Sequence, residues 1–258
     1  MASEDQSFDQ ARAQLGHVAE LRGLGWGTLA LGFYEPTERW ITGLLEGEVA
    51  ADFRKAVGWL DGDRQRFEDP LAMLGGWSGE MAESDPAAVL RDLKVEYARL
   101  FIGAPGPMEA PPYESLYRDR DADGSPIVSG PSTVAVERTY GSYGLERAAG
   151  HTDLPDHVAT ELEFMHFLCS RERQAWQGGE VSDARTLRSA QNAFVTEHLN
   201  KWLPEFSERV LGATHMDVYR ALATLLQDFL AVEAGGGYAR ETLRGVFGEG
   251  GQRKVTGP

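Results

Sequence analysis

The chain has 258 residues, of which 42% are hydrophobic, so it can bury a substantial core in one large domain or two small ones. Its formal net charge of −15 disfavours binding to nucleic acids and to anionic membrane surfaces, and it would attract a basic partner. No apolar run approaches the roughly 18 residues of a membrane-spanning helix, and the polar, acidic N-terminal segment does not resemble a secretory signal. These features predict a cytoplasmic protein.

The first part of the chain, about residues 8–102, has the pattern of successive helices. Four glycines between residues 23 and 32 weaken the first helix, which is predicted over about residues 8–34. Shorter helices are expected over 37–46, 48–60 and 64–83. Asp85 then suits the N-cap of the next helix and Pro86 its first turn, and apolar residues recur along one face of that helix as far as Phe101.

Residues 103–131 differ from the rest of the chain because they contain six prolines and several glycines. No helix is expected in a segment of this composition. A loop of this length is uncommon in a compact domain unless it has a function or acts as a hinge between two parts. Two adjacent prolines in it fix the backbone before Tyr113, Glu114 and Ser115. Tyr113 is either an aromatic residue of a binding surface or a side chain that fills the core from a rigid loop.

Helical periodicity resumes over about residues 132–247. The strongest helix is predicted to begin at Asp153, which can cap it, with Pro155 in its first turn. Another helix covers about residues 184–201, and Pro204 is expected to interrupt the run that follows.

Together these patterns predict an all-α fold, a single helical domain of about ten helices over residues 1–250 with a long Pro/Gly-rich loop near its middle. No strand-like alternation was found, and a flexible tail is predicted over 248–258. The one cysteine, Cys169, lies in the apolar run Phe167-Leu-Cys169, which favours a buried thiol over a reactive one.

One predicted helix carries residue types that bind metals. Asp153, His157 and Glu161 recur at four-residue spacing, and Glu163 and His166 form an E-x-x-H element. The sequence has no second E-x-x-H, which a di-iron site needs. A solvated helix face with local ion pairs explains the row as well as a metal-dependent enzyme does. No nucleophile or phosphate-loop motif is present, so no catalytic residue, metal or cofactor is predicted.

Five short motifs follow one another in an order that is more specific than any one of them. They are Glu96-Tyr-Ala-Arg-Leu-Phe-Ile-Gly103, Pro111-Pro-Tyr-Glu-Ser115, Asp153-Leu-Pro-Asp-His157, Thr160-Glu-Leu-Glu-Phe-Met165 and Phe194-Val-Thr-Glu-His-Leu-Asn-Lys-Trp-Leu-Pro-Glu-Phe206. In this order they resemble the TorD/DmsD/NarJ family of redox-enzyme maturation proteins, most strongly over residues 90–210. The preceding helices also fit the helical N-terminal half of that family.

The resemblance implies an all-helical chaperone without enzymatic activity. It implies a partner, the apo catalytic subunit of a molybdopterin-dependent oxidoreductase of the DMSO-reductase type, often bound at its twin-arginine signal peptide. Such proteins assist molybdenum-cofactor insertion before export or assembly. Two other functions stay open: a metal-dependent enzyme that uses Asp153, His157, Glu161 and His166, and a structural subunit of the mature complex. Two oligomeric states also stay open, a monomer and a domain-swapped dimer.

The family's acidic-x-x-Asp-His motif corresponds to Asp153, Asp156 and His157, although Leu154 stands where the family has proline. The loop tyrosine region corresponds to Tyr113, Glu114 and Ser115. We expect Asp156, with Glu114 or Glu161 nearby, to meet the arginines of the signal peptide, because carboxylates match guanidinium groups in a bidentate geometry. Trp77 is either a further groove residue or part of the core.

Overall fold

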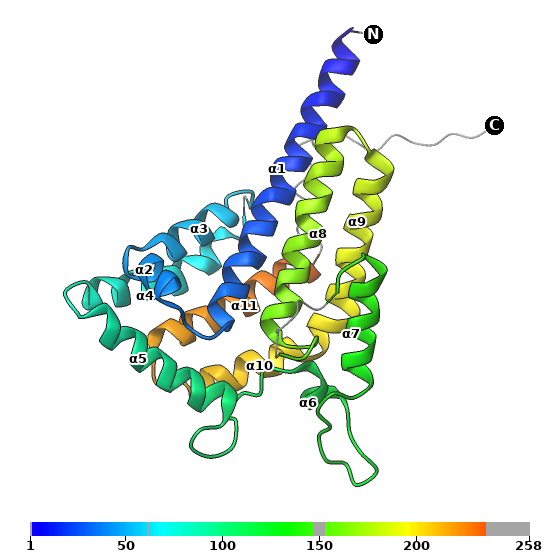
Figure 1. Ribbon diagram of the computed structural model, residues 1–258. Helices are drawn as coiled ribbons and strands as arrows, with labels where there is room; N and C mark the ends of the chain where they lie inside the picture. Colours follow the sequence, from blue (N-terminus) through cyan, green and yellow to red (C-terminus); the bar gives the residue numbers. More distant parts are fainter. Residues whose placement is uncertain (1, 61, 147–152, 236–258) are drawn as a thin grey trace.

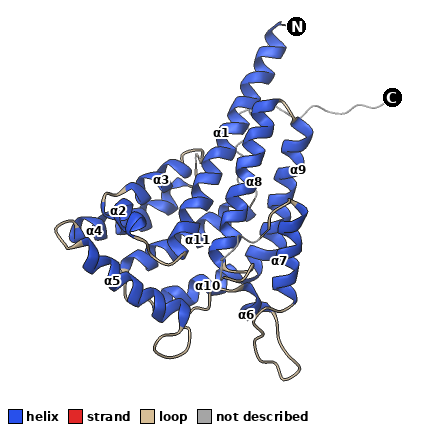
Figure 2. Ribbon diagram, in the orientation of Figure 1, coloured by secondary structure: helices blue, strands red, loops and turns tan. Residues whose placement is uncertain are grey.

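A computed structural model describes residues 2–60, 62–146 and 153–235 of the chain. These ranges contain helices and no β-strand, so the predicted all-α fold is confirmed (Figure 2). The predicted tail, 248–258, lies outside the described residues. The α-helices are α1 (Ala2–Phe33), α2 (Glu38–Leu45), α3 (Glu48–Ala56), α4 (Glu68–Met81), α5 (Pro86–Tyr97), α6 (Glu114–Arg118), α7 (Pro131–Ser142), α8 (Val158–Gly178), α9 (Val181–Phe194), α10 (Asn200–Ala213) and α11 (Asp217–Ala234). A 3₁₀ turn, η1 (Arg64–Phe67), and two π-helical turns, η2 (Ala98–Ile102) and η3 (Val195–Leu199), adjoin them.

The long helices α1, α8 and α9 run side by side, with α2 to α5 on one side of them and α7 on the other (Figure 1). Helix α1 packs on α8, α3 and α11, and α11 also packs on α4 and α10. One core of buried apolar side chains extends from Trp26 in α1 to Val232 in α11. Within the described ranges, no helix combines the length and the apolar character needed to cross a membrane.

The start of α5 agrees with the sequence prediction. The Asp85 carboxylate accepts a hydrogen bond from the backbone N–H of Ala87 at 3.2 Å, and Pro86 occupies the first turn. The apolar face that follows is buried against the core and includes Leu93 and Phe101. Cys169 is also buried, as predicted, and burial raises the pKa of its thiol.

Two predictions that were based on prolines are wrong. The segment 103–131 does contain a short helix, α6, which forms in the proline-free stretch directly after Pro112. Pro204 does not interrupt the chain but lies inside α10. The π-helical turn η3 directly precedes α10. Its wider backbone lies next to the turn in which the proline ring would otherwise clash with the carbonyl group four residues earlier.

Helix α1 continues through its glycines because both of its buried faces pack very closely on neighbours. A Cβ atom at Gly27 would lie 3.0 Å from Nδ1 of His166 in α8, and one at Gly25 would lie 2.6 Å from the Phe229 ring in α11. The glycines therefore let two helices approach α1 from different sides. Tertiary packing outweighs the low helix propensity that weakened the sequence prediction.

Alanine at Gly25 is expected to lower the free energy of unfolding by up to about 2 kcal/mol, because overpacking a core costs about 1–3 kcal/mol and the gain in helix propensity returns about 1. The Phe229 ring cannot retreat easily, since it packs on Trp26 and Phe53. Gly76 in α4 is the matched control: it is exposed and has open space around its Cα, so alanine there should stabilise the protein by roughly 0.5–1 kcal/mol. Urea unfolding of both variants checks the opposite signs, and stabilisation by Gly25→Ala would contradict the packing argument.

Candidate functional site

Two segments that are far apart in the sequence meet where α6 and α8 begin. The N–H of Val158 donates to the carbonyl oxygen of Pro112 at 2.8 Å, and the N–H of Glu114 donates to that of Asp156 at 3.0 Å. Tyr113 and His157 form an antiparallel bridge between these bonds. We call residues 112–115 and 153–158 the α6–α8 junction. The structure thus brings together the loop tyrosine and the Asp-His pair that the sequence singled out.

Asp156 holds this junction with its side chain as well as its backbone. Its Oδ2 accepts a hydrogen bond from the N–H of Ser115 at 2.9 Å, in the first turn of α6. A carboxylate in that place satisfies a backbone donor that has no partner within the short helix. Asp156 therefore caps α6, although α6 begins at Glu114, 42 positions earlier in the chain.

Helix α8 begins at Val158, which corrects the prediction that it begins at Asp153. His157 is its N-cap, and the Nδ1 atom of His157 accepts the N–H of Ala159 at 3.2 Å. The carbonyl oxygens of Pro155 and Asp156 instead bind Tyr140 Oη and Glu114 N, so bonds to other segments replace a local helical turn. Asp153, His157 and Glu161 therefore do not share one helix face.

The aromatic side of the junction includes a residue that the sequence did not indicate. Tyr34, just after α1, stacks on the His157 ring at 6.0 Å between centroids and 12° between planes, and Tyr113 meets the same ring edge-on at 5.3 Å. The Tyr34 hydroxyl donates to Oε2 of Glu163 at 2.7 Å. Tyr34 and Tyr113 are both half-buried. No sequence motif linked Tyr34 to His157, because 122 residues separate them.

Below the junction lies a cluster of acidic side chains with no exposed surface: Glu114, Asp156 and Glu161 are each 0% exposed. Glu114 binds the Arg118 guanidinium and Nδ1 of His198, the latter at 2.9 Å, while Nε1 of Trp202 donates to Oε2 of Glu161 at 3.0 Å. The structure gives Asp156 Oδ1 and Glu161 Oε1 no hydrogen-bond partner among the described residues.

This burial changes the expectation for these carboxylates. The four-residue spacing of Asp153, His157 and Glu161 also suited a solvated helix face. The structure contradicts that interpretation for His157, which is 2% exposed, and for Glu161, which is fully buried. An arginine from a partner would reach Asp156, Glu114 or Glu161 only if the junction opened, so direct contact stays a prediction. Sequence reasoning missed their partners Arg118, His198 and Trp202, although the last two lie in the Phe194–Phe206 motif.

Desolvation, followed by the nearby charge of Glu114, raises the pKa of Glu161 well above its ordinary value. The folded protein therefore binds this proton more tightly than the unfolded chain. The resulting stability is complete below the pKa that Glu161 has in the unfolded chain, and it is lost as the pH rises through the raised pKa of the folded protein.

Glu161→Gln imitates the protonated form, so its stability relative to the wild type should increase with pH between about pH 5 and pH 8. Urea unfolding across this range tests the prediction, with exposed Glu208→Gln as the control; parallel curves for Glu161→Gln and the wild type would contradict it.

A pocket of about 660 Å³ lies beside the junction, between α7 and α8. Apolar and aromatic side chains form much of its lining, and carboxylates are spread along it. The lining residues are Glu137, Tyr140, Gly141, Leu145, Glu146, Asp153, Pro155, Thr160, Glu163, Phe164, His166 and Phe167. A ligand with apolar groups and positive charge matches such a lining. Asp153 belongs both to the pocket and to the junction.

Two other predicted residues lie outside the junction, although His166 also lines the pocket. Trp77 lies on α4, partly buried against the core, and α4 packs on α11, α2 and α3 rather than on the junction. Nδ1 of His166 is bonded to the carbonyl oxygen of Gly23 at 2.7 Å. In the part of the chain that the structure describes, no group of three or more His, Cys, Asp or Glu side chains is arranged to hold a metal ion.

Comparison with known proteins places the chain in a family. The family model described as "Nitrate reductase delta subunit" matches residues 64–208, which include both segments of the junction. The chain belongs to this family. The resemblance to the TorD/DmsD/NarJ proteins is thereby confirmed.

The family includes relatives that are named as chaperones. The chain is 34% identical to the selenate reductase assembly chaperone protein of Thauera selenatis over 149 residues, 57% of this chain and 72% of the relative. It is 32% identical to the chlorate reductase assembly chaperone protein of Ideonella dechloratans over 49% of this chain and 61% of the relative. It is 27% identical to the chaperone protein TorD of Vibrio cholerae over 54% of this chain and 59% of the relative. The chain thus spans less than two thirds of the length of the latter two.

Proposed function

We propose that this protein is a chaperone for the apo catalytic subunit of a molybdopterin-dependent oxidoreductase of the DMSO-reductase type. The observation that carries the proposal is the similarity to relatives named as assembly chaperones for selenate and chlorate reductases. The protein binds its client in the cytoplasm and assists cofactor insertion before export or assembly. It needs no catalytic residue and no cofactor of its own for this role.

The client segment is proposed to be a twin-arginine signal peptide, which combines adjacent arginines with an apolar stretch. The pocket between α7 and α8 suits such a peptide, because its aromatic lining can take the apolar stretch and its carboxylates can pair with guanidinium groups. Two of the pocket carboxylates adjoin the junction: Asp153 is part of it, and Glu163 accepts the hydrogen bond of Tyr34, which stacks on His157. In this proposal the buried Asp156, Glu114 and Glu161 hold Tyr113 and His157 in position beside the pocket.

The decisive experiment for the client is a pull-down of the tagged full chain from its native host grown without oxygen, followed by mass spectrometry. Recovery of a large molybdopterin-dependent subunit in its apo form supports the chaperone. Recovery only with the finished, cofactor-loaded enzyme would instead support a structural subunit of the mature complex. No such partner, together with near-stoichiometric metal in the purified protein, would support the metal-dependent enzyme.

The binding site is tested by fluorescence anisotropy with a labelled synthetic signal peptide that contains two adjacent arginines. Glu137→Lys combined with Asp153→Lys should weaken binding at least about tenfold, because two pocket carboxylates become repulsive to the arginines. The matched control makes the same charge change at Glu83 and Glu208, which are exposed and lie outside the pocket. Equal weakening by both pairs would mean that only the net charge matters and would reject the pocket.

A further inference from the structure

The outward face of α5 forms one side of a second groove, far from α7 (Figure 1). Six residues at helical spacing line it, and the Ala104–Pro105 loop forms the opposite wall, around a space of about 630 Å³. The six residues are Ala87, Leu90, Arg91, Lys94, Val95 and Ala98. Residues at these intervals lie on a single helix face, so the groove runs along the whole of α5.

This groove exposes apolar surface that the fold does not need. Val95 is 65% exposed, and Ile102, one turn beyond the groove lining in η2, is 58% exposed. The opposite face of α5 already secures the helix, because Val89, Leu93 and Tyr97 are buried in the core. The groove therefore combines exposed apolar side chains with charged neighbours, as the apolar centre and polar rim of a protein-binding surface do.

The groove is also basic on a strongly acidic chain. Arg91 is exposed and makes no ion pair with any described residue. Lys94 pairs with Glu35 at 2.6 Å, but both side chains are about half exposed, so the pair is weak and an incoming carboxylate can compete for it. The pocket between α7 and α8 has the opposite character, since four carboxylates line it.

We propose that the α5 groove docks an acidic amphipathic helix of a partner protein. A helix of about twelve residues matches α5 in length, roughly 18 Å, and can set apolar side chains on Val95 and Leu90 while its carboxylates meet Arg91 and Lys94. The inference does not depend on the proposed function, since it concerns another surface and a partner segment of opposite charge.

The test uses the full chain and two labelled fourteen-residue amphipathic peptides that share one leucine face and carry either glutamates or glutamines beside it. Anisotropy titrations are expected to show the wild type binding the glutamate peptide at least about tenfold more tightly than the glutamine peptide. Arg91→Glu combined with Lys94→Glu should reverse this preference. Val95→Asp should weaken the glutamate peptide at least about tenfold, because it places a charge on the apolar contact.

The control variant is Arg54→Glu with Lys55→Glu, which makes the same charge change on exposed residues of α3. It should leave the preference for the glutamate peptide intact. Equal affinity of the wild type for the two peptides, or the same reversal by the α3 variant, would overturn the proposal. Self-association of the wild type in sedimentation velocity that Val95→Asp abolishes would overturn it in favour of a second copy as the occupant.

Discussion

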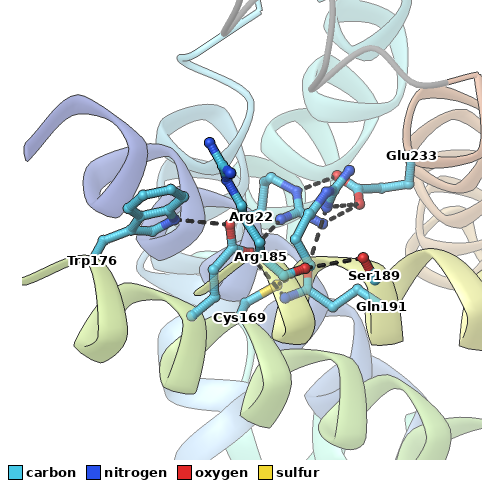
Figure 3. Close-up of polar contacts among 9 residues, drawn as sticks. Arg22, Cys169, Trp176, Arg185, Ser189, Gln191 and Glu233 are labelled. Atoms are coloured by element: carbon cyan, nitrogen blue, oxygen red, sulfur yellow. Dashed lines mark hydrogen bonds and ion pairs between the residues drawn. The ribbon is translucent and has the colours of Figure 1, made fainter. Parts of the chain in front are cut away.

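Replacing Arg22 by methionine is expected to destabilise the fold by about 3–5 kcal/mol, the cost of leaving buried charges without their partner. Arg22 lies in α1 with no exposed surface (Figure 3). Its Nε donates to Oε1 of Glu233 at 2.7 Å, and its Nη1 donates to Oε2 of Glu172 at 3.2 Å. The substitution would remove the guanidinium that faces both buried carboxylates. Glu233 would keep the longer pair with Arg188, at 3.5 Å, and Glu172 would keep neutral donors such as Gln191. For a chain of this size the melting temperature should fall on the order of 10 °C.

Thermal and urea unfolding measure this loss, and Arg173→Met is the control. Arg173 pairs with Glu20 at 3.5 Å on the surface, where both side chains are about 40% exposed, so its removal should cost less than about 1 kcal/mol. Adding Glu172→Gln and Glu233→Gln to Arg22→Met should recover part of the stability, because the buried charges that lost Arg22 are then removed. No recovery in the triple variant would show that lost packing, rather than unpaired charge, causes the effect.

The all-α fold was predictable because local signals agree with the final packing. The Asp85–Pro86 helix start and the apolar face from Val89 to Phe101 each depend on residues within a few turns of one another. Where local signals conflict with tertiary contacts, the sequence misleads. Gly25 argues against a helix by propensity, yet α1 passes through it because Phe229, more than 200 residues away, needs the space.

Tertiary contacts that the sequence does not reveal also decide where single side chains of the candidate site lie. The family resemblance assigned Tyr113 and His157 to one client-binding site, and the structure brings them into contact. The sequence could not show that Asp156 caps α6 rather than its own helix, because that bond joins residues 41 positions apart. The burial of Glu161 was equally hidden, since its spacing also suits a solvated face.

Asp156→Ala is expected to weaken binding of a twin-arginine peptide more than about tenfold and to lower the free energy of unfolding by about 1–3 kcal/mol. The carboxylate is fully buried, and its loss leaves the N–H of Ser115 without its acceptor. The two backbone hydrogen bonds would still join the start of α6 to the segment before α8, but Tyr113 would be held less firmly beside His157. Because Asp156 has no exposed surface, the binding loss would come from a displaced junction rather than from a lost contact with the peptide.

Asp85→Ala is the matched control, because Asp85 also caps a helix with its carboxylate but lies on α5, away from the junction. It should cost about 0.5–2 kcal/mol of stability and leave peptide affinity unchanged. If both alanine variants bound the peptide like the wild type, the junction would have no part in binding.

The double variant Asp156→Asn with His157→Ala gives an independent check. Asparagine retains an acceptor for Ser115 N, whereas alanine removes both the N-cap of α8 and the ring on which Tyr34 and Tyr113 pack. Unchanged affinity in that variant would make the site assignment wrong even if Asp156→Ala alone unfolded the protein.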